Sequence, residues 1–185
     1  SIDAPLNPLS LALGAEATFV ARTIDSDRKH LTAVLSAAAR HRGTSLVEIY
    51  QNCPIFNDGA FDAVKDPETR DEAIIPLEHG EPIRFGHDQH LGVVRAAGGG
   101  VEVVEINDSN AGDVLVHDAY APDATMAFAL SRITDTGVVR RAPIGIFRQV
   151  ERATYDDLSR EQTALAGETP SLQALLDGPD AWTVA

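Results

Sequence analysis

The sequence is poor in cysteine, since Cys53 is the only one among its 185 residues. A lone cysteine cannot form a disulfide within the chain, and the first thirty residues hold no signal-peptide pattern, so we expect a reducing, cytoplasmic location. No apolar run approaches the roughly 18 residues that span a bilayer, which predicts no membrane partner. The chain lacks an initiating methionine, and residues 1–5 have a loop-like composition, so we expect a piece of a longer protein.

Positive charge is also scarce. The chain has 15 lysines and arginines against 28 aspartates and glutamates, which gives a formal net charge of −13. Such a chain has no diffuse positive field to attract phosphate groups, so binding to nucleic acid or to an anionic membrane is disfavoured. The stretch 19–50 departs from this balance, because it carries five basic residues against three acidic ones. The length suffices for one ordinary domain with its own core.

Helical and strand patterns alternate in the first 50 residues. Residues 7–16 predict a short helix with a proline in its first turn, and the short, apolar, partly β-branched stretch 18–22 predicts a buried strand. We expect Ser26 to cap a second helix that ends at Gly43, and residues 45–50 to form a second strand. Strand, helix and strand within about thirty residues form a βαβ unit with parallel strands.

This topology brings two segments to one edge of the predicted sheet. Ligands of open parallel sheets gather beyond the carboxyl ends of the strands. Residues 22–29 follow the first strand, and residues 51–54 follow the second. We therefore expect Lys29 and Cys53 to lie at the edge where a cofactor would bind.

Cys53 is the strongest candidate for a functional residue. The residues alone allow three interpretations, namely a small buried apolar side chain, a nucleophile, or a metal or cluster ligand. A nucleophile needs a histidine base, and none is adjacent in the sequence. A cluster needs three further ligands, which this chain cannot supply as cysteines. Asn52 and Asn57 lie close enough to satisfy backbone groups of the loop.

Lys29 is one of only two lysines and is the second candidate. A cation at a helix N-terminus opposes the helix dipole, a small cost that a functional role would explain; a solvated surface lysine is the alternative. Four histidines lie within residues 79–117, and His87 and His90 have a ligand-like spacing. They flank turns and strands rather than one helical face, so solvated or hydrogen-bonded roles are favoured over a zinc site.

The composition changes beyond Asn57. Residues 57–72 are rich in acidic side chains and predict an exposed, irregular linker. The glycine run 98–100 predicts a hairpin turn, because it lacks the helix and lysine of a phosphate-binding loop. We expect strands at 73–75, 82–85, 91–95, 101–106, 114–116 and 144–147, and helices at 126–130, 156–165 and within 170–182. The predicted fold class is α/β, with a parallel βαβ part followed by a small antiparallel β-rich region with helices.

Several of these stretches resemble the β subunit of 2-oxoacid:ferredoxin oxidoreductases, most closely the 2-oxoglutarate type found in actinobacteria. The matching stretches are residues 7–15, 18–22, 27–31, 46–58 and 143–147, together with Tyr155. The Cys-Pro-x-x-Asn-Asp run that begins at Cys53 is the most specific motif. The resemblance implies a partial thiamine-diphosphate-binding domain in residues 1–56, an acidic linker at 57–72 and a β-rich C-terminal extension at 73–185.

The resemblance also implies the activity of an enzyme complex. Such a complex decarboxylates a 2-oxoacid such as 2-oxoglutarate with thiamine diphosphate and Mg²⁺, passes electrons through a 4Fe-4S cluster to ferredoxin, and releases an acyl-CoA. The implied partners are the α subunit, the upstream half of the β subunit, ferredoxin, CoA and the 2-oxoacid, in a cytoplasmic heterotetramer. Cys53 matches the last of the family's four cluster ligands, and Lys29 matches a lysine on the ferredoxin or CoA side.

Other family motifs are not found in this sequence. The three further cluster cysteines and the Gly-Asp-Gly-Asp motif that holds Mg²⁺ are missing, so we expect no catalytic residue in this segment and expect those motifs upstream of Ser1. Two alternatives stay open. One is a non-catalytic α/β interaction domain that binds a partner protein, and the other is part of a thiamine enzyme that does not use ferredoxin.

Overall fold

The predicted βαβ unit is present in the computed structural model, which describes residues 5–133, 139–167, 171–179 and 181–182. The strands β1 (Phe19–Ile24) and β2 (Ser45–Tyr50) are parallel neighbours, and α2 (Arg28–Arg40) connects them. The short helix α1 (Pro8–Gly14) precedes β1 and begins with a proline, as expected. The parallel pairing puts the carboxyl ends of both strands at one edge of the sheet.

The ends of α2 differ from the prediction. Asp27, rather than Ser26, is the N-cap, and its carboxylate accepts a hydrogen bond from the His30 N–H at 3.0 Å. A carboxylate satisfies the free N–H groups as a hydroxyl would and adds a favourable interaction with the helix dipole. The helix ends at Arg40, and Gly43 lies in the following turn with a φ of +141°.

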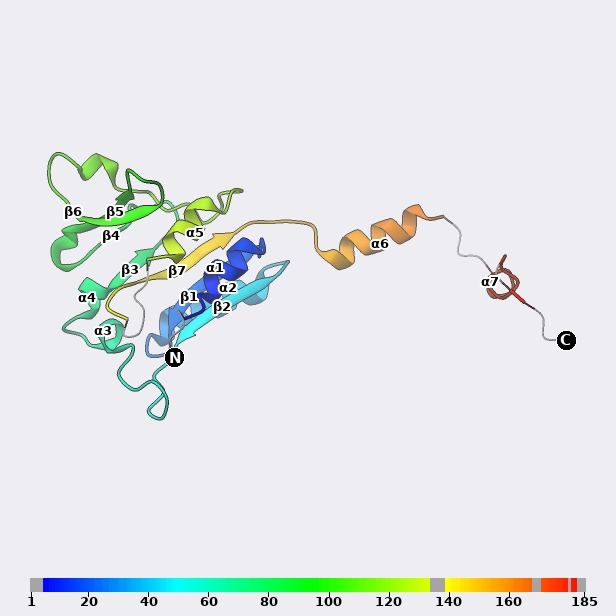
Figure 1. Cartoon of the computed structure of the whole chain (residues 1–185), viewed down its shortest axis with the longest axis horizontal. Coiled ribbons are helices and arrows are strands. Elements are labelled where there is room, and N and C mark those ends of the chain that lie inside the picture. Colours follow the sequence, from blue (N-terminus) through cyan, green and yellow to red (C-terminus); the bar gives the residue numbers. More distant parts are fainter. Residues whose placement is uncertain (1–4, 134–138, 168–170, 180, 183–185) are drawn as a thin grey trace. The chain divides into compact units, whose positions relative to one another are not determined.

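A four-stranded mixed sheet forms around this unit, in the order β2-β1-β7-β3 (Figure 1). β3 (Ile74–Leu77) and β7 (Ala142–Gln149) are parallel to each other, and β7 runs antiparallel to β1. β2 is therefore an edge strand, and only its last residue, Tyr50, is buried. Strands from both sides of the expected linker thus join one sheet, while the domain boundaries implied by the resemblance stay a prediction.

A second, smaller sheet confirms the predicted antiparallel region. It consists of β4 (Arg84–Phe85), β5 (Leu91–Arg95) and β6 (Val101–Glu105), in that order. The glycine turn at 98–100 connects β5 to β6, as expected for a hairpin. The stretch 114–116, predicted as a strand, makes only isolated bridges to residues of other segments.

Helices cover both faces of the four-stranded sheet. On one face, α2 contributes Val34 to a core cluster with Phe19 and Ala21 of β1. On the other face, a larger core joins Val20 of β1 to apolar side chains of α1, of α5 and of the second sheet. The remaining helices are α3 (Asp62–Lys65), α4 (Arg70–Ala73), α5 (Thr125–Ser131), α6 (Tyr155–Leu165), α7 (Leu172–Leu176) and the 3₁₀ turns His87–Gln89 and Ala111–Asp113.

The acidic stretch 57–72 is more ordered than predicted. It contains α3 and most of α4, and Val64 of α3 is buried with Ile24 and Tyr50, the last residues of β1 and β2. Apolar residues spaced along an otherwise acidic stretch account for this packing, since their burial outweighs the solvation of neighbouring charges. The stretch therefore packs onto the carboxyl edge of the parallel strands instead of forming an exposed linker.

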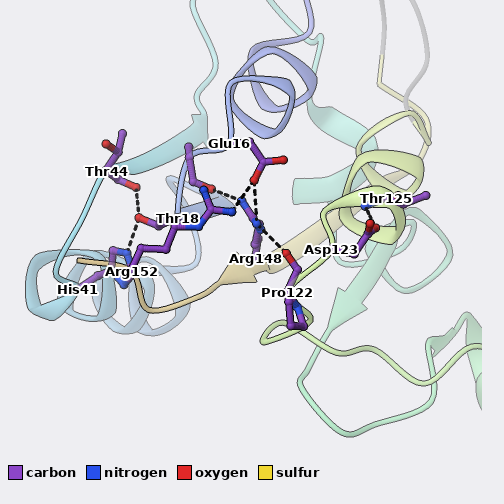
Figure 2. Close-up of polar contacts among 10 residues, drawn as sticks. Glu16, Thr18, His41, Thr44, Pro122, Asp123, Thr125, Arg148 and Arg152 are labelled. Atoms are coloured by element: carbon purple, nitrogen blue, oxygen red, sulfur yellow. Dashed lines mark hydrogen bonds and ion pairs between the residues drawn. The ribbon is translucent and has the colours of Figure 1, made fainter. Parts of the chain in front are cut away.

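A buried arginine joins three segments near the end of β7 (Figure 2). The Arg148 guanidinium donates hydrogen bonds to the carbonyl oxygens of Ala17 (3.0 Å) and Pro122 (2.9 Å) and to the carboxylate of Glu16 (3.1 Å). Arg152 reaches the same carboxylate at 2.7 Å, and this hydrogen bond, together with the charge of Arg148, lowers the pKa of Glu16. This network lies at the start of β1, the end opposite to Cys53, and it has a structural role.

The chain divides into two units, residues 1–152 and 153–185. The second unit contains α6 and α7, which begin after the capping side chains of Thr154 and Ser171. No residue of either helix is buried. Among the residues that the structure describes, no helix has the length and apolar character needed to cross a membrane.

Candidate functional site

The candidate site lies at the carboxyl edge of β1 and β2. Residues 25–29 lead from β1 into α2, and residues 51–59 leave β2, so the parallel pairing places Lys29 and Cys53 at the same edge. The first of these segments is tied to α3, because Lys65 forms an ion pair with Asp25 at 2.9 Å.

Cys53 begins a tight turn directly after β2. The Asn57 N–H donates a hydrogen bond to the Cys53 carbonyl oxygen at 2.9 Å, which closes the turn. Cys53 is a half-buried residue with a free thiol, and hydrogen bonds from the backbone N–H groups of Phe56 and Ile55 lower the pKa of that thiol. N–H groups that point at sulfur stabilise the thiolate, the form that acts as a ligand or nucleophile. A small buried apolar side chain, one of the three interpretations of Cys53, does not describe this arrangement.

Asn52 holds the turn from its other side. Its amide nitrogen donates to the Asp58 carboxylate at 2.9 Å, and its amide oxygen accepts from the Gly59 N–H at 3.0 Å. Asn52 therefore satisfies loop backbone groups, as its position in the sequence suggested. Between these anchors, Ile55 and Phe56 are 82% and 88% exposed, so the tip of the turn presents apolar surface to the outside.

The nucleophile interpretation lacks a base. Among the residues that the structure describes, no hydrogen bond joins Cys53 to a histidine, and His30, on the neighbouring helix, bonds instead to the Thr23 hydroxyl at 2.8 Å. His87 and His90 are both exposed, and a ring nitrogen of His90 contacts the His87 carbonyl oxygen. Within the described ranges, no group of three His, Cys, Asp or Glu side chains comes together in a way that could hold a metal ion.

Arg22 does not contribute to a basic edge, although the sequence grouped it with Lys29. β1 continues past Arg22 to Ile24, and the guanidinium is buried within the sheet, 2.6 Å from the Glu48 carboxylate of β2 and 4.9 Å from the centre of the Tyr50 ring. A charge can remain inside a strand when a neighbouring strand supplies its counterion in register. Arg22 and Glu48 are direct partners in the β1–β2 pairing.

The rest of the basic stretch is divided between the two ends of α2. Arg28 and Lys29 are exposed in the first turn, at the same edge of the sheet as Cys53, whereas Arg40 and Arg42 lie at the far end of the helix. A helix of 13 residues is about 20 Å long, so these charges do not act on one site. The positive charge at the Cys53 edge is therefore smaller than the five basic residues of the stretch 19–50 would supply together, and the role of Lys29 stays a prediction.

Comparison with known proteins relates the chain to one group of enzymes. No protein-family model matches the chain. Over its whole length it is 51% identical to the 2-oxoglutarate oxidoreductase subunit KorB of Mycobacterium tuberculosis, and it spans half the length of that relative. Shorter matches over 58 residues, at 38% and 40% identity, relate 31% of the chain to 19% of the β subunits of 2-oxoacid:ferredoxin oxidoreductases from Saccharolobus solfataricus and a Sulfolobus species.

A solved structure shares the fold. It is the 2-oxoglutarate:ferredoxin oxidoreductase from Magnetococcus marinus with 2-oxoglutarate, coenzyme A and succinyl-CoA bound. The superposition has a TM-score of 0.56 and covers 96% of this chain and 45% of that one. The sequence identity is 20%, so this likeness concerns the fold.

Proposed function

We propose that this chain, a homologue of one half of a 2-oxoglutarate oxidoreductase subunit, is part of the β subunit of a 2-oxoacid:ferredoxin oxidoreductase. The observation that carries the proposal is the 51% identity to KorB along the entire chain. The reaction is the oxidative decarboxylation of a 2-oxoacid, with 2-oxoglutarate as the substrate, to an acyl-CoA. The electrons pass to ferredoxin, and the α subunit is the partner in a cytoplasmic complex.

In this proposal Cys53 supplies one thiolate to a 4Fe-4S cluster. The turn fits a cluster ligand, because Cys53 is a half-buried residue with a free thiol, and the backbone N–H groups of Phe56 and Ile55 lower the pKa of that thiol. Hydrogen bonds to cluster sulfurs are one of the means by which proteins set the reduction potential. When bound, a cluster carries single electrons toward ferredoxin. The other three ligands must come from residues outside these 185, which contain no second cysteine.

The proposal gives this chain no part in holding the other implied cofactors. Among the described residues, no three His, Cys, Asp or Glu side chains come together in a metal-binding arrangement. The proposal therefore assigns no decarboxylation step to this chain. Its own residues present the Cys53 thiolate, hold the turn through Asn52, and place Lys29 at the same edge.

Substitution of Cys53 in the complete enzyme tests the cluster role. We expect Cys53→Ala to lose the visible absorption of the cluster and the electron paramagnetic resonance signal of the reduced cluster. Ser26→Ala, an exposed position in the connection from β1 to α2, is the control and should keep both signals. A Cys53→Ala enzyme that retains the iron content and spectrum of the parent would refute the proposed ligand.

A further inference from the structure

The loop that carries Cys53 has no buried residue of its own. It consists of residues 51–59, which follow Tyr50 at the end of β2, and each of them is exposed or half-buried. Hydrogen bonds such as the one from the Asn57 N–H to the Cys53 carbonyl oxygen give this Cys53 loop its local shape. They do not fix its place on the sheet, because a segment without buried apolar contacts is held only at its ends. The position of the Cys53 sulfur therefore depends on the residues that flank the loop.

The two ends of the Cys53 loop are joined by a pair of aromatic rings. Tyr50 precedes the loop, and Phe61 follows it after the buried residue Ala60. The two rings are stacked, with their centroids 4.5 Å apart and their planes inclined by 23°. Stacked rings attract each other beyond what their buried area provides, and they favour a particular relative orientation. The ring pair thus closes the base of the loop.

Contacts with the rest of the fold hold this ring pair in place. The Arg22 guanidinium of β1 lies 4.9 Å from the centre of the Tyr50 ring. Val64 of α3 is buried in the same core cluster as Tyr50. The Ala60 carbonyl oxygen, next to the second ring, accepts a hydrogen bond from the Val139 N–H at 2.9 Å. The base of the loop is therefore anchored to β1, to α3 and to the segment that precedes β7.

We propose that Phe61 is a positioning residue for Cys53: its ring, stacked on Tyr50, closes the Cys53 loop and holds the sulfur where it can share a cluster with ligands from outside this chain. The inference rests on the proposed function, because it takes Cys53 as a cluster ligand. A ligand keeps its place only when packing around it fixes the backbone that carries it. Without the ring pair the loop can shift as a unit, and the bond from the Cys53 sulfur to iron is weakened.

Two substitutions of Phe61 in the complete enzyme separate the ring from the apolar character of the side chain. Phe61→Leu keeps an apolar side chain and removes the ring, whereas Phe61→Tyr keeps the ring. We expect Phe61→Leu to release cluster iron to a chelator about two- to tenfold faster than the parent, the range that the loss of one aromatic pair corresponds to. The electron paramagnetic resonance signal of its reduced cluster should also change. Phe61→Tyr should restore the release rate and the signal of the parent.

Val34→Ala is the matched control for a general loss of stability. Val34 of α2 is 3% exposed and belongs to the core cluster with Phe19 and Ala21, away from the ring pair. This variant should lower the thermal unfolding midpoint and leave iron release and the resonance signal as in the parent. Unchanged iron release in Phe61→Leu, or an equal increase in Phe61→Leu and Val34→Ala, would overturn the positioning role.

A double variant tests whether the two rings act together. If Tyr50 and Phe61 act as a pair, the enzyme with both Tyr50→Leu and Phe61→Leu should release iron no faster than the faster single variant. Fold-changes that multiply in the double variant would refute the pair. Loss of the cluster in Cys53→Ala beside parent-like iron release in Phe61→Leu would refute the positioning role alone, whereas a cluster retained in Cys53→Ala would refute the proposed function itself.

Discussion

Arg22 is an arginine held inside a sheet, and its partners account for its burial. Glu48 provides the counterion, the Pro143 carbonyl oxygen accepts a hydrogen bond at 3.3 Å, and the rings of Tyr50 and Phe147 lie above the guanidinium. Removing one partner of a buried ion pair leaves the other charge without compensation, which costs more than the pair itself contributes.

The first prediction concerns this pair. We expect Arg22→Ala to lower the free energy of unfolding by about 3–5 kcal/mol, because Glu48 loses its counterion and a cavity opens beneath Tyr50. Arg28→Ala, an exposed arginine near the same edge, should change it by less than about 0.5 kcal/mol. Urea unfolding followed by circular dichroism measures both values, and a similar loss in the two variants would contradict the buried pair.

The second prediction is a pH dependence of stability. His117 is buried with a ring nitrogen 2.7 Å from the Ile146 carbonyl oxygen, and burial lowers its pKa below the ordinary 6.5. The folded chain therefore binds this proton more weakly than the unfolded chain, so the stabilisation is complete above pH 6.5 and is lost as the pH falls below it. His30 and His41 have pKa values lowered chiefly by burial and act in the same direction.

The free energy of unfolding should fall between pH 7 and pH 5, with His117 contributing at most about 1.4 kcal/mol per pH unit. His117→Gln keeps an amide N–H that can donate to the Ile146 carbonyl oxygen, so its stability should depend less steeply on pH. His87→Gln, at an exposed position, serves as the control. Denaturant unfolding across this range gives the slopes, and parallel slopes in wild type and His117→Gln would exclude the residue as the source.

The third prediction concerns Lys29, which is exposed in the first turn of α2 at the Cys53 edge. If it contacts ferredoxin or CoA, Lys29→Gln should raise the KM for that partner about two- to fivefold with little change in kcat, as expected for one rim charge. Arg40→Gln, at the opposite end of the same helix, should leave both KM values unchanged. Steady-state assays with each partner varied in turn distinguish the two roles, and unaltered KM values would show a solvated surface lysine.

At the scale of the elements, β7 is the strand that unites the sheet, and a glycine allows it to do so. Gly145 has a φ of +141°, and a Cβ at this position would collide with the Leu77 carbonyl oxygen of β3. We expect Gly145→Ala to lower the free energy of unfolding by about 3 kcal/mol, from backbone strain and the displacement of β3.

Gly14→Ala is the control for this prediction. It should be neutral or stabilising by up to about 1 kcal/mol, since open space surrounds that helical position. Thermal unfolding of the two variants compares them, and equal midpoints would disprove the close approach.

Helices and strands that are encoded by patterns of a few neighbouring residues could be predicted from the sequence. Which strands pair with one another could not. The proline start of α1 and the spacing of α2 are encoded within a few residues, so the βαβ unit and the common edge of Lys29 and Cys53 were correct. β7 pairs with β1 across more than 110 residues, and nothing local indicates such a contact. The burial of Arg22 depends on Glu48 of another strand, and no pattern within a few residues of Arg22 indicates that pairing.

The candidate site was predictable to a similar extent. The position of Cys53 after a strand follows from local patterns, and so does the use of Asn52 to satisfy the loop. The backbone N–H groups that face the sulfur depend on the three-dimensional course of the turn, and composition gives no indication of them. The position of β2 at the edge is also a property of the whole sheet, because it depends on how all the other strands are ordered.

At the scale of the whole molecule, the buried apolar residues are unevenly distributed along the chain. Every buried apolar side chain in the described residues lies between Leu9 and Val150, within the unit 1–152. The last residue of this unit, Arg152, forms an ion pair with Glu16. In the described part of residues 153–185, the helices bury no side chain. Cooperative stability follows buried apolar area, so we place it in residues 1–152.

The last prediction follows from that distribution. A chain that ends at Arg152 should unfold within about 2 °C of the 185-residue chain, since a larger shift would correspond to about 1 kcal/mol or more. Its dependence on urea should also be unchanged, because the slope scales with the surface exposed on unfolding. Differential scanning calorimetry and urea titration of the two chains measure both quantities. A midpoint lowered by more than about 5 °C would show that α6 or α7 contributes to the cooperative core, and the stability would then have to be shared across the boundary at Arg152.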